Sequence, residues 1–232
     1  MIKDPPRMTI RTAFPRPAPD TVAALQGAAT GHLVDALGGR GALDWRIKPI
    51  VAESRTPSAF CGVAVTALAG AADNLGFYGA LEVSRPGDVI VIATDEHDGC
   101  AVIGDLVLGM ARNRGVVAVV TDGLVRDLAG IEQVGLPVFA RGISPNSPAR
   151  NGPAAVGEAL TLGGVTIASG DVVVGDRDGV VVVPRDRVDA VIVALEEVRK
   201  LESENEAAVR DGLEIPGYVT ELLASDQVRR LD

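Results

Sequence analysis

Residues 100–127 contain the pattern that most restricts how this chain folds. Between positions 106 and 111, apolar side chains recur at the spacing of one helical face, and Gly115 is placed to end that helix. The run Val116–Val120 follows, apolar at every position and rich in β-branched residues. Such a run is typical of a strand buried on both faces of a sheet, so the stretch predicts an α/β fold.

Two polar dipeptides flank this helix and strand. Gly104-Asp105 opens the helix, and Arg126-Asp127 follows the Asp122-Gly123 turn that leads out of the strand. Open α/β sheets bind ligands at the carboxyl ends of their strands, beside helix N-termini. We therefore expect an anion-binding helix start, a guanidinium and a carboxylate to meet at one place. Taken alone, the first dipeptide is also typical of an ordinary helix start, and the second of a salt bridge.

The rest of the chain alternates short apolar runs with Gly, Pro and Asp turns. We expect an N-terminal arm (1–19) packed loosely or on a neighbouring subunit, an α/β domain (20–200), and a C-terminal helical extension (201–232) that contacts a neighbouring subunit. Residues 141–157 are expected to form a loop. The runs predict strands at 47–51, 61–68, 89–93, 137–140, 165–167, 172–174 and 180–183, and helices at 20–29, 30–37, 74–81, 128–134 and 186–210.

Composition narrows the class of protein. Hydrophobic residues make up 47% of the chain but aromatic residues only 3%, so the core must consist of Val, Leu, Ile and Ala. A net charge of −9 argues against a nucleic-acid partner. Cys61 and Cys100 match neither a disulfide framework nor a zinc-ligand spacing. No signal peptide is recognisable, and no apolar run reaches the ~18 residues that span a bilayer, so we expect a cytoplasmic protein without a membrane partner.

Several common catalytic motifs are missing. The sequence has no phosphate-binding loop, no G-x-S-x-G, no H-E-x-x-H, and no glycine-rich dinucleotide motif after a strand. Carboxylates, arginine and backbone amides remain, and this set suits a hard divalent cation with an anionic oxygen substrate. His97 lies in the acidic loop Asp95–Asp98, which also follows a predicted strand. The loop is either a solvated turn or a segment that brings His97 over the site.

Residues 116–145 (VVAVVTDGLVRD followed by LAGIEQVGLPVFARGISP) resemble the signature of a known family. It contains the regulator of ribonuclease E activity A and the 4-hydroxy-4-methyl-2-oxoglutarate / 4-carboxy-4-hydroxy-2-oxoadipate aldolases. The resemblance covers roughly residues 20–212. It implies an α/β/β/α swivelling-domain sandwich, assembled as trimers or hexamers with sites between subunits. Further matching segments are TGHLVDAL (30–37), GVAVT (62–66), DNL (73–75), PGDV (86–89) and GDVVVGDRDGVVVVP (170–184).

The aldolase branch of that family implies a role for the first dipeptide and its neighbours. Backbone amides after Gly104, at Leu106 and Val107, would hold a pyruvate carboxylate, as a helix N-terminus should. Arg126 would bind the pyruvyl keto oxygen and stabilise the enolate. Asp105 would order the water that exchanges protons with the pyruvate methyl group.

The same resemblance implies a metal and a contribution from a neighbouring subunit. Asp127 would hold Mg²⁺ or Mn²⁺, mostly through waters. An acidic residue on the last helix would reach the neighbour's site, and Glu206 with Arg210 is the best local match to the family's E-x-x-x-R, with Glu204 as the alternative. A solvated, charged helix face would explain these acids equally well.

The resemblance predicts a class II, metal-dependent pyruvate aldolase. Such a lyase would cleave a 4-hydroxy-2-oxo acid by a retro-aldol reaction and release pyruvate. It would also decarboxylate oxaloacetate through the same metal-stabilised enolate. The alternative is a non-catalytic, ring-shaped regulatory protein that binds a ribonuclease or another enzyme. Asp127 favours the enzyme, because the regulator branch lacks the metal carboxylate.

Overall fold

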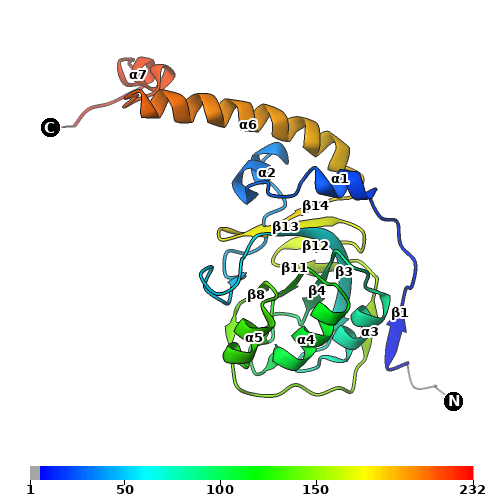
Figure 1. The fold of residues 1–232 in the computed structure, drawn as a ribbon. Coiled ribbons are helices and arrows are strands. Elements are labelled where there is room, and N and C mark those ends of the chain that lie inside the picture. The colour runs from blue at the N-terminus through cyan, green and yellow to red at the C-terminus, as the bar shows by residue number, and fades with distance from the viewer. Residues whose placement is uncertain (1–5, 232) are drawn as a thin grey trace.

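A nine-stranded mixed sheet lies at the centre of the structure, a computed structural model that describes residues 6–231 (Figure 1). Strands β3, β4, β6 and β8 run parallel to one another, and β13 and β14 branch from β3 as an antiparallel hairpin. Along the sheet the strands are β1 (Met8–Ile10), β10 (Ala154–Val156), β3 (Phe60–Ala69), β4 (Asp88–Ala93), β6 (Ala118–Thr121), β8 (Val138–Ala140) and β2 (Lys48–Pro49), with β13 (Val172–Asp176) and β14 (Gly179–Val183) off this path.

Alternating side chains on these strands build three separate cores. In β4, Ile90 and Ile92 pack toward α3 (Leu75–Val83), α4 (Asp105–Asn113) and α5 (Leu128–Val134). Val89 and Val91 pack on the other face, toward β11 (Leu160–Leu162), β12 (Val165–Ile167) and the β13–β14 hairpin. The hairpin's opposite face packs on α2 (Thr30–Ala36), α6 (Val188–Arg210) and the residues after α1 (Pro19–Ala23). Because strand side chains alternate between faces, the result is four layers, which confirms the predicted α/β/β/α sandwich.

A second, three-stranded parallel sheet was not predicted. It consists of β5 (Ala101–Ile103), β7 (Leu124–Val125) and β9 (Gly142–Ile143). The Arg126 amide donates to the Ile103 carbonyl and the Ser144 amide to the Val125 carbonyl, each at 3.0 Å. Two- and three-residue strands are too short to show a hydrophobic period. The prediction that 141–157 is only a loop is therefore wrong, since both β9 and β10 lie within it.

The N-terminal segment packs on its own chain. Strand β1 pairs in parallel with β10, and Arg16 forms an ion pair with the buried Asp88, with Nη2 2.9 Å from Oδ2. The expectation of an arm that is loose or on a neighbour is thus wrong for residues 8–16, because the edge of β10 and a buried carboxylate both bind it. Residues 1–5 lie outside the described residues. The domain boundaries at 19 and 200 stay a prediction.

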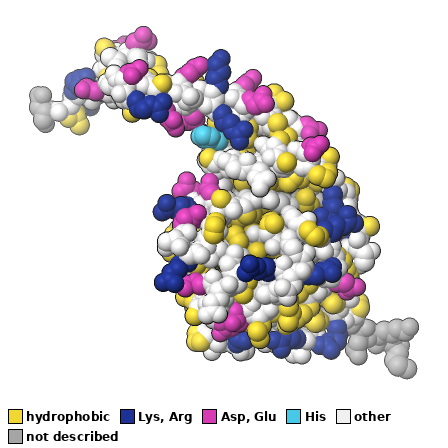
Figure 2. Space-filling view, viewed as in Figure 1, with side chains coloured by type: hydrophobic (Ala, Val, Ile, Leu, Met, Phe, Trp, Pro, Cys, Tyr) yellow, Lys and Arg dark blue, Asp and Glu magenta, His cyan; other side chains and the backbone are white. Residues whose placement is uncertain are grey.

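Helix α6 is anchored only at its start. Its buried residues are Val188, Val191 and Leu195, and the remainder of its 23 residues extends away from the domain toward α7 (Gly217–Leu223) (Figure 1). At 1.5 Å per residue the helix is about 35 Å long. Figure 2 shows acidic and basic side chains spread along this projection. No helix within residues 6–231 is long and apolar enough to cross a membrane.

Candidate functional site

The two predicted dipeptides meet at the carboxyl edge of the small parallel sheet. Gly104-Asp105 follows β5, Arg126-Asp127 follows β7, and Ser147 lies beyond β9 and accepts a hydrogen bond from Arg126 Nη1. Parallel strands end at the same edge, so the sheet gathers all three segments. From the sequence, this meeting is expected at the end of the strand that became β6. The structure instead extends the chain past β6 into β7, and the site lies at the end of β7.

Gly104 allows the close approach of the second dipeptide. A Cβ atom at this position would lie 2.6 Å from Asp127 Oδ2 and 3.3 Å from Arg126 Nε. An added Cβ would force the Asp127 carboxylate to shift, so glycine lets the two charged groups lie this close to the start of α4. Gly104 has extended backbone dihedral angles and is the N-cap of α4. The backbone conformation at this position does not itself call for glycine, so the close approach of Asp127 is the feature that favours it.

Asp127 directs its carboxylate away from the helix that it begins. Its backbone is left-handed (φ 64°, ψ 47°), a conformation that costs a non-glycine residue roughly 1–3 kcal/mol. Its carbonyl accepts the amides of Gly130 and Ile131 at 2.9 Å, while its side chain makes no capping bond. Oδ2 lies 3.2 Å from Arg126 Nε, and the side chain is 43% exposed. The carboxylate is thus held beside Arg126 with an open face.

The start of α4 has one predicted anion-binding amide already occupied. The first amides of a helix have no intrahelical acceptor. The Leu106 amide donates to Asp105 Oδ1 at 2.7 Å, whereas no acceptor is found for the Val107 amide within residues 6–231. Asp105 packs against Gly130 of α5, where an added Cβ would lie 2.5 Å from Asp105 Cβ. An anion at this helix start would have to share the Leu106 amide with Asp105 or displace it.

These groups line a small pocket of about 90 Å³. Three polar residues of the lining were not predicted from the sequence: Asn74, Tyr78 and Arg150. Asn74 Nδ2 donates to the Val102 carbonyl at 3.0 Å, but its buried Oδ1 has no partner within residues 6–231. A buried acceptor without a donor costs free energy, so Asn74 points to a ligand or water in the pocket. The sequence showed only an Asn before a helix, which is an ordinary capping pattern.

Asp73 fixes the segment that carries Arg150. Its carboxylate accepts the amides of Leu75 (2.7 Å) and Gly152 (3.1 Å), and also that of Asn151. Burial alone would raise the pKa of Asp73, but the three amide donors together lower it by more than burial raises it. The pKa of Asp73 therefore lies below its usual value. The loop is thereby tied to the first turn of α3.

The donor set restricts the metal that the pocket fits. No group of three or more His, Cys, Asp or Glu side chains within residues 6–231 is arranged to hold a metal ion. Asp127 and Asp105 are the carboxylates of the pocket. Mg²⁺ commonly uses one or two carboxylates and keeps several waters, so the residues fit Mg²⁺ or Mn²⁺ and not a zinc or calcium cage.

Two other predicted residues do not reach the pocket within one chain. His97 is absent from the pocket lining, and its imidazole lies against Gly99. Glu206 lies on the projecting half of α6 and pairs with Arg210 at 3.6 Å (Figure 1). The distal half of that helix extends away from α4 and α5.

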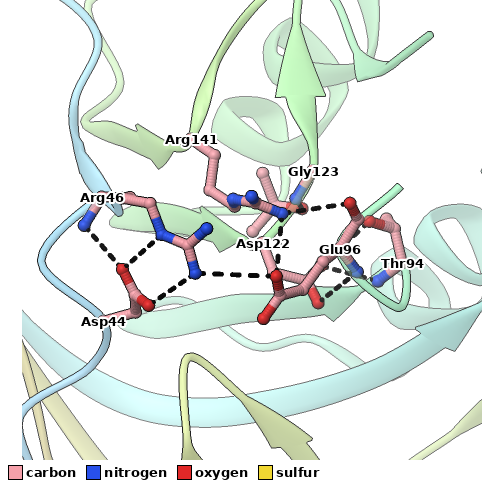
Figure 3. A network of polar contacts seen from close by, with 8 residues as sticks. Asp44, Arg46, Thr94, Glu96, Asp122, Gly123 and Arg141 are labelled. Atoms are coloured by element: carbon pink, nitrogen blue, oxygen red, sulfur yellow. Dashed lines mark hydrogen bonds and ion pairs between the residues drawn. The ribbon is translucent and has the colours of Figure 1, made fainter. Parts of the chain in front are cut away.

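A different polar cluster occupies the carboxyl ends of β4, β6 and β8 (Figure 3). We call Asp44, Arg46, Glu96, Asp122 and Arg141 the paired network. Glu96 Oε2 lies 3.2 Å from Arg141 Nη1 and 3.6 Å from Arg46 Nη2, and Arg46 also pairs with Asp44 at 2.7 Å.

Asp122 is the buried member of the paired network. It accepts the Thr94 amide (2.7 Å), the Thr94 hydroxyl (3.0 Å) and the Glu96 amide (3.1 Å). Burial raises the pKa of Asp122 despite these donors. Every charged group of the network therefore has a partner, and the cluster ties the 94–98 loop to the sheet.

Comparison with known proteins assigns the family. The model of the RraA-like family, described as Aldolase/RraA, matches residues 30–182, which include the whole pocket lining but not Glu206. A protein of Halalkalibacterium halodurans named "Putative 4-hydroxy-4-methyl-2-oxoglutarate aldolase" is 33% identical over 191 residues, covering 82% of this chain and 88% of that one.

Solved structures agree in fold. An uncharacterized protein from Pseudomonas syringae pv. tomato has a TM-score of 0.73 at 26% identity, covering 86% of this chain and 96% of that one. The RNA-processing inhibitor RraA from Thermus thermophilis has a TM-score of 0.61 at 25% identity, covering 68% and 94%. The chain belongs to the RraA-like, Aldolase/RraA family.

Proposed function

We propose that this protein is a divalent-metal-dependent lyase that cleaves a 4-hydroxy-2-oxo acid and releases pyruvate. The observation that carries the proposal is the convergence of the α4 start, Arg126 and Asp127 around Gly104, where an added Cβ would lie 2.6 Å from Asp127 Oδ2. The aldolase name of the Halalkalibacterium relative supports the same class of reaction.

Arg126 is arranged to hold a developing negative charge. Its Nη1 is bonded to Ser147 and its Nε lies beside Asp127, while Nη2 has no acceptor within residues 6–231. A guanidinium fixed on two sides presents its remaining donors in one direction. We assign these donors to the 2-keto oxygen, which becomes an enolate oxygen in the transition state. A donor of this kind stabilises the transition state by about 3–4 kcal/mol.

The start of α4 would bind the substrate carboxylate. The Val107 amide is available, and the helix dipole favours an anion there. Asp105 would move from the Leu106 amide and order a water near the carbon that gains or loses a proton. Asp127, with Asp105 through waters, would hold Mg²⁺ or Mn²⁺, which when bound supplies Lewis acidity at the substrate's 2-oxo acid oxygens.

The reaction balances without another reactant. The 4-hydroxyl group loses its proton to the water held by Asp105, and a carbonyl forms at C4 as the C3–C4 bond breaks. The bonding electrons pass to the enolate oxygen that Arg126 binds. Protonation at C3 then gives pyruvate. Oxaloacetate would lose CO₂ to the same enolate, so decarboxylation should accompany aldol cleavage.

Neighbouring subunits would complete the site. The pocket is small, and α6 carries Glu206 away from the domain that makes it. In a closed trimer or hexamer the same contact would repeat at every interface. We therefore propose that Glu206 acts in the site of a neighbouring subunit.

The test is a coupled pyruvate assay with a panel of 2-oxo acids and Mg²⁺ or Mn²⁺. Wild-type protein should release pyruvate from 4-hydroxy-2-oxo acids and from oxaloacetate, and Arg126→Lys should lose most of that rate because lysine lacks the fork geometry. The second candidate, a regulator of an RNA-processing enzyme, is favoured by the likeness to the Thermus inhibitor. A protein with no metal-dependent turnover of any 2-oxo acid would favour that candidate.

A further inference from the structure

A larger cavity lies at the amino ends of the parallel strands, away from the pocket that contains Gly104. We call it the α1 cavity, because it is formed between α1 and the starts of β3, β4 and β6. Its volume is about 390 Å³, within the roughly 300–1,000 Å³ of sites that enclose small-molecule ligands. The residues that line it include Val22, Cys61, Val63, Arg85, Asp88 and Val117.

Helix α4 separates the α1 cavity from the Gly104 pocket. The start of α4 borders that pocket, whereas Gly115, just beyond its end, accepts the amide of Gly87 in the α1 cavity (2.9 Å). At 1.5 Å per residue, the nine residues of α4 span about 14 Å. Among residues 6–231, none lines both cavities. The proposed lyase chemistry therefore does not account for the α1 cavity.

The charged groups of the α1 cavity leave one positive charge unpaired. Asp88 is buried, and its carboxylate accepts both terminal nitrogens of Arg16 and the backbone amide of Arg85 (2.8 Å). Arg16 and Asp88 therefore neutralise each other, and the Phe14 ring fixes Arg16 from the other side, 4.6 Å from its guanidinium carbon. None of the ion pairs between residues 6 and 231 includes Arg85. Its guanidinium is available to an external anion.

Most of the remaining wall of the α1 cavity is apolar. Val22, Val63 and Val117 line it together with three prolines. Burial raises the pKa of the Cys61 thiol to about 11, so this side chain is an uncharged part of the same wall. Each methylene group buried against such a wall raises affinity by about fourfold. The wall thus favours a hydrocarbon body beside the free guanidinium.

We infer that the α1 cavity binds an amphipathic monocarboxylate, with its carboxylate on Arg85 and its alkyl chain against Val22, Val63 and Val117. One unpaired guanidinium matches one carboxylate. Any further charge on the ligand would lie against valine side chains and lose its hydration without gaining a partner. A fully apolar ligand would leave the Arg85 charge uncompensated. This binding site is separate from the proposed lyase site and does not depend on it.

The first experiment titrates the full-length protein with octanoate, octan-1-ol and acetate, followed by NMR. Wild type should bind octanoate at least about tenfold more tightly than octan-1-ol, the scale of a charged hydrogen bond. It should prefer octanoate to acetate by at least the same factor, because acetate lacks the buried methylenes. Arg85→Gln should lose the preference over octan-1-ol. Arg177→Gln, an exposed arginine outside the α1 cavity, is the matched control and should keep it. Arg126→Lys should also keep it, because that residue lines the other pocket.

The second experiment fills the α1 cavity. Ala23 is exposed on α1 and lines the cavity, so Ala23→Trp places a large side chain there without altering the buried core. Octanoate binding should fall by at least about tenfold with Tm unchanged. Absence of octanoate binding by wild type, or wild-type affinity in Arg85→Gln or Ala23→Trp, would overturn the inference. Sedimentation of the same proteins identifies the competing occupant: a changed subunit number in both variants, without octanoate binding by wild type, would mean that a second copy fills the cavity.

Discussion

Two polar clusters lie at the carboxyl ends of parallel strands, and they differ in how completely their groups are paired. In the paired network, Glu96 bridges Arg46 and Arg141, and the buried Asp122 accepts three hydrogen bonds. In the pocket, no group within residues 6–231 donates to Asn74 Oδ1 or forms an ion pair with Arg150. Both clusters combine acids with arginines at strand ends.

Position at a strand end therefore does not by itself identify a site. The network's charges neutralise one another and tie the 94–98 loop to the main sheet, although solvent screening weakens its exposed ion pairs. The pocket keeps groups unsatisfied and holds Asp127 in a strained conformation, both of which cost stability. Substitutions in the two clusters should accordingly affect different properties: turnover in the pocket, and stability in the network.

The largest expected effect is at Asp127. Asp127→Asn keeps a residue that tolerates the left-handed backbone but removes the charge that would hold the metal. Turnover should fall by about 10²- to 10³-fold or more, with little change in Tm. Pyruvate release and thermal unfolding are measured on the same samples, with Glu96→Gln from the network as the control that keeps turnover. Wild-type rates from Asp127→Asn, or from the chelated wild-type protein, would contradict the metal mechanism.

The next effect tests whether the pocket is completed by a neighbour. Glu206→Ala should lower turnover by on the order of 10²-fold although Arg126 and Asp127 are intact, since it removes a positioned acid or base. Mixing it with inactive Arg126→Ala under conditions of subunit exchange should restore part of the activity, because some interfaces then contain both wild-type residues. A fully active Glu206→Ala protein would refute the shared site but not the lyase.

A smaller effect shows whether Gly104 matters for the pocket or only for helix α4. Gly104→Ala places a Cβ 2.6 Å from Asp127 Oδ2 and should lower turnover by about 10- to 100-fold through displacement of the charged groups. Gly109→Ala lies in the same helix with no atom within 4 Å of the added Cβ. It should retain turnover and stabilise α4 by up to about 1 kcal/mol. Equal losses from the two variants would mean that Gly104 serves only the helix.

The smallest effect is on stability in the paired network and depends on pH. Burial raises the pKa of Asp122 above its usual value of 3.8, so the folded state retains this proton to higher pH than the unfolded state. The stability contributed by protonated Asp122 is fully present below pH 3.8 and is lost as pH rises through the raised pKa. The free energy of unfolding is measured in urea between pH 4 and 7 for wild type and Asp122→Asn. Any excess of the wild-type value over the variant's value should shrink as pH rises. An excess that grows with pH would mean that folding favours the charged Asp122 carboxylate.

The main strands and helices could be predicted because each carries its own periodic or continuous apolar pattern. Residues 118–120 of the run Val116–Val120 lie in β6, Gly115 follows the end of α4 in a left-handed conformation, and the 175–179 turn joins β13 to β14. These elements depend on residues close together in the chain, so local sequence determined them. The meeting of Gly104-Asp105 with Arg126-Asp127 was also expected, but at the carboxyl end of the strand that became β6 and not at the end of β7.

Only the tertiary structure decided which sheet edge carries the site and what else lines it. Strands β5, β7 and β9 have two or three residues each and pair only because the surrounding core brings them together. Asn74 and Arg150 join the pocket from segments that are distant in sequence, through hydrogen bonds of Asp73 and Ala149. A local pattern encodes burial and period along one element. Pairing of very short strands, and the approach of a carboxylate to a glycine 23 positions away, depend on long-range packing that no such pattern contains.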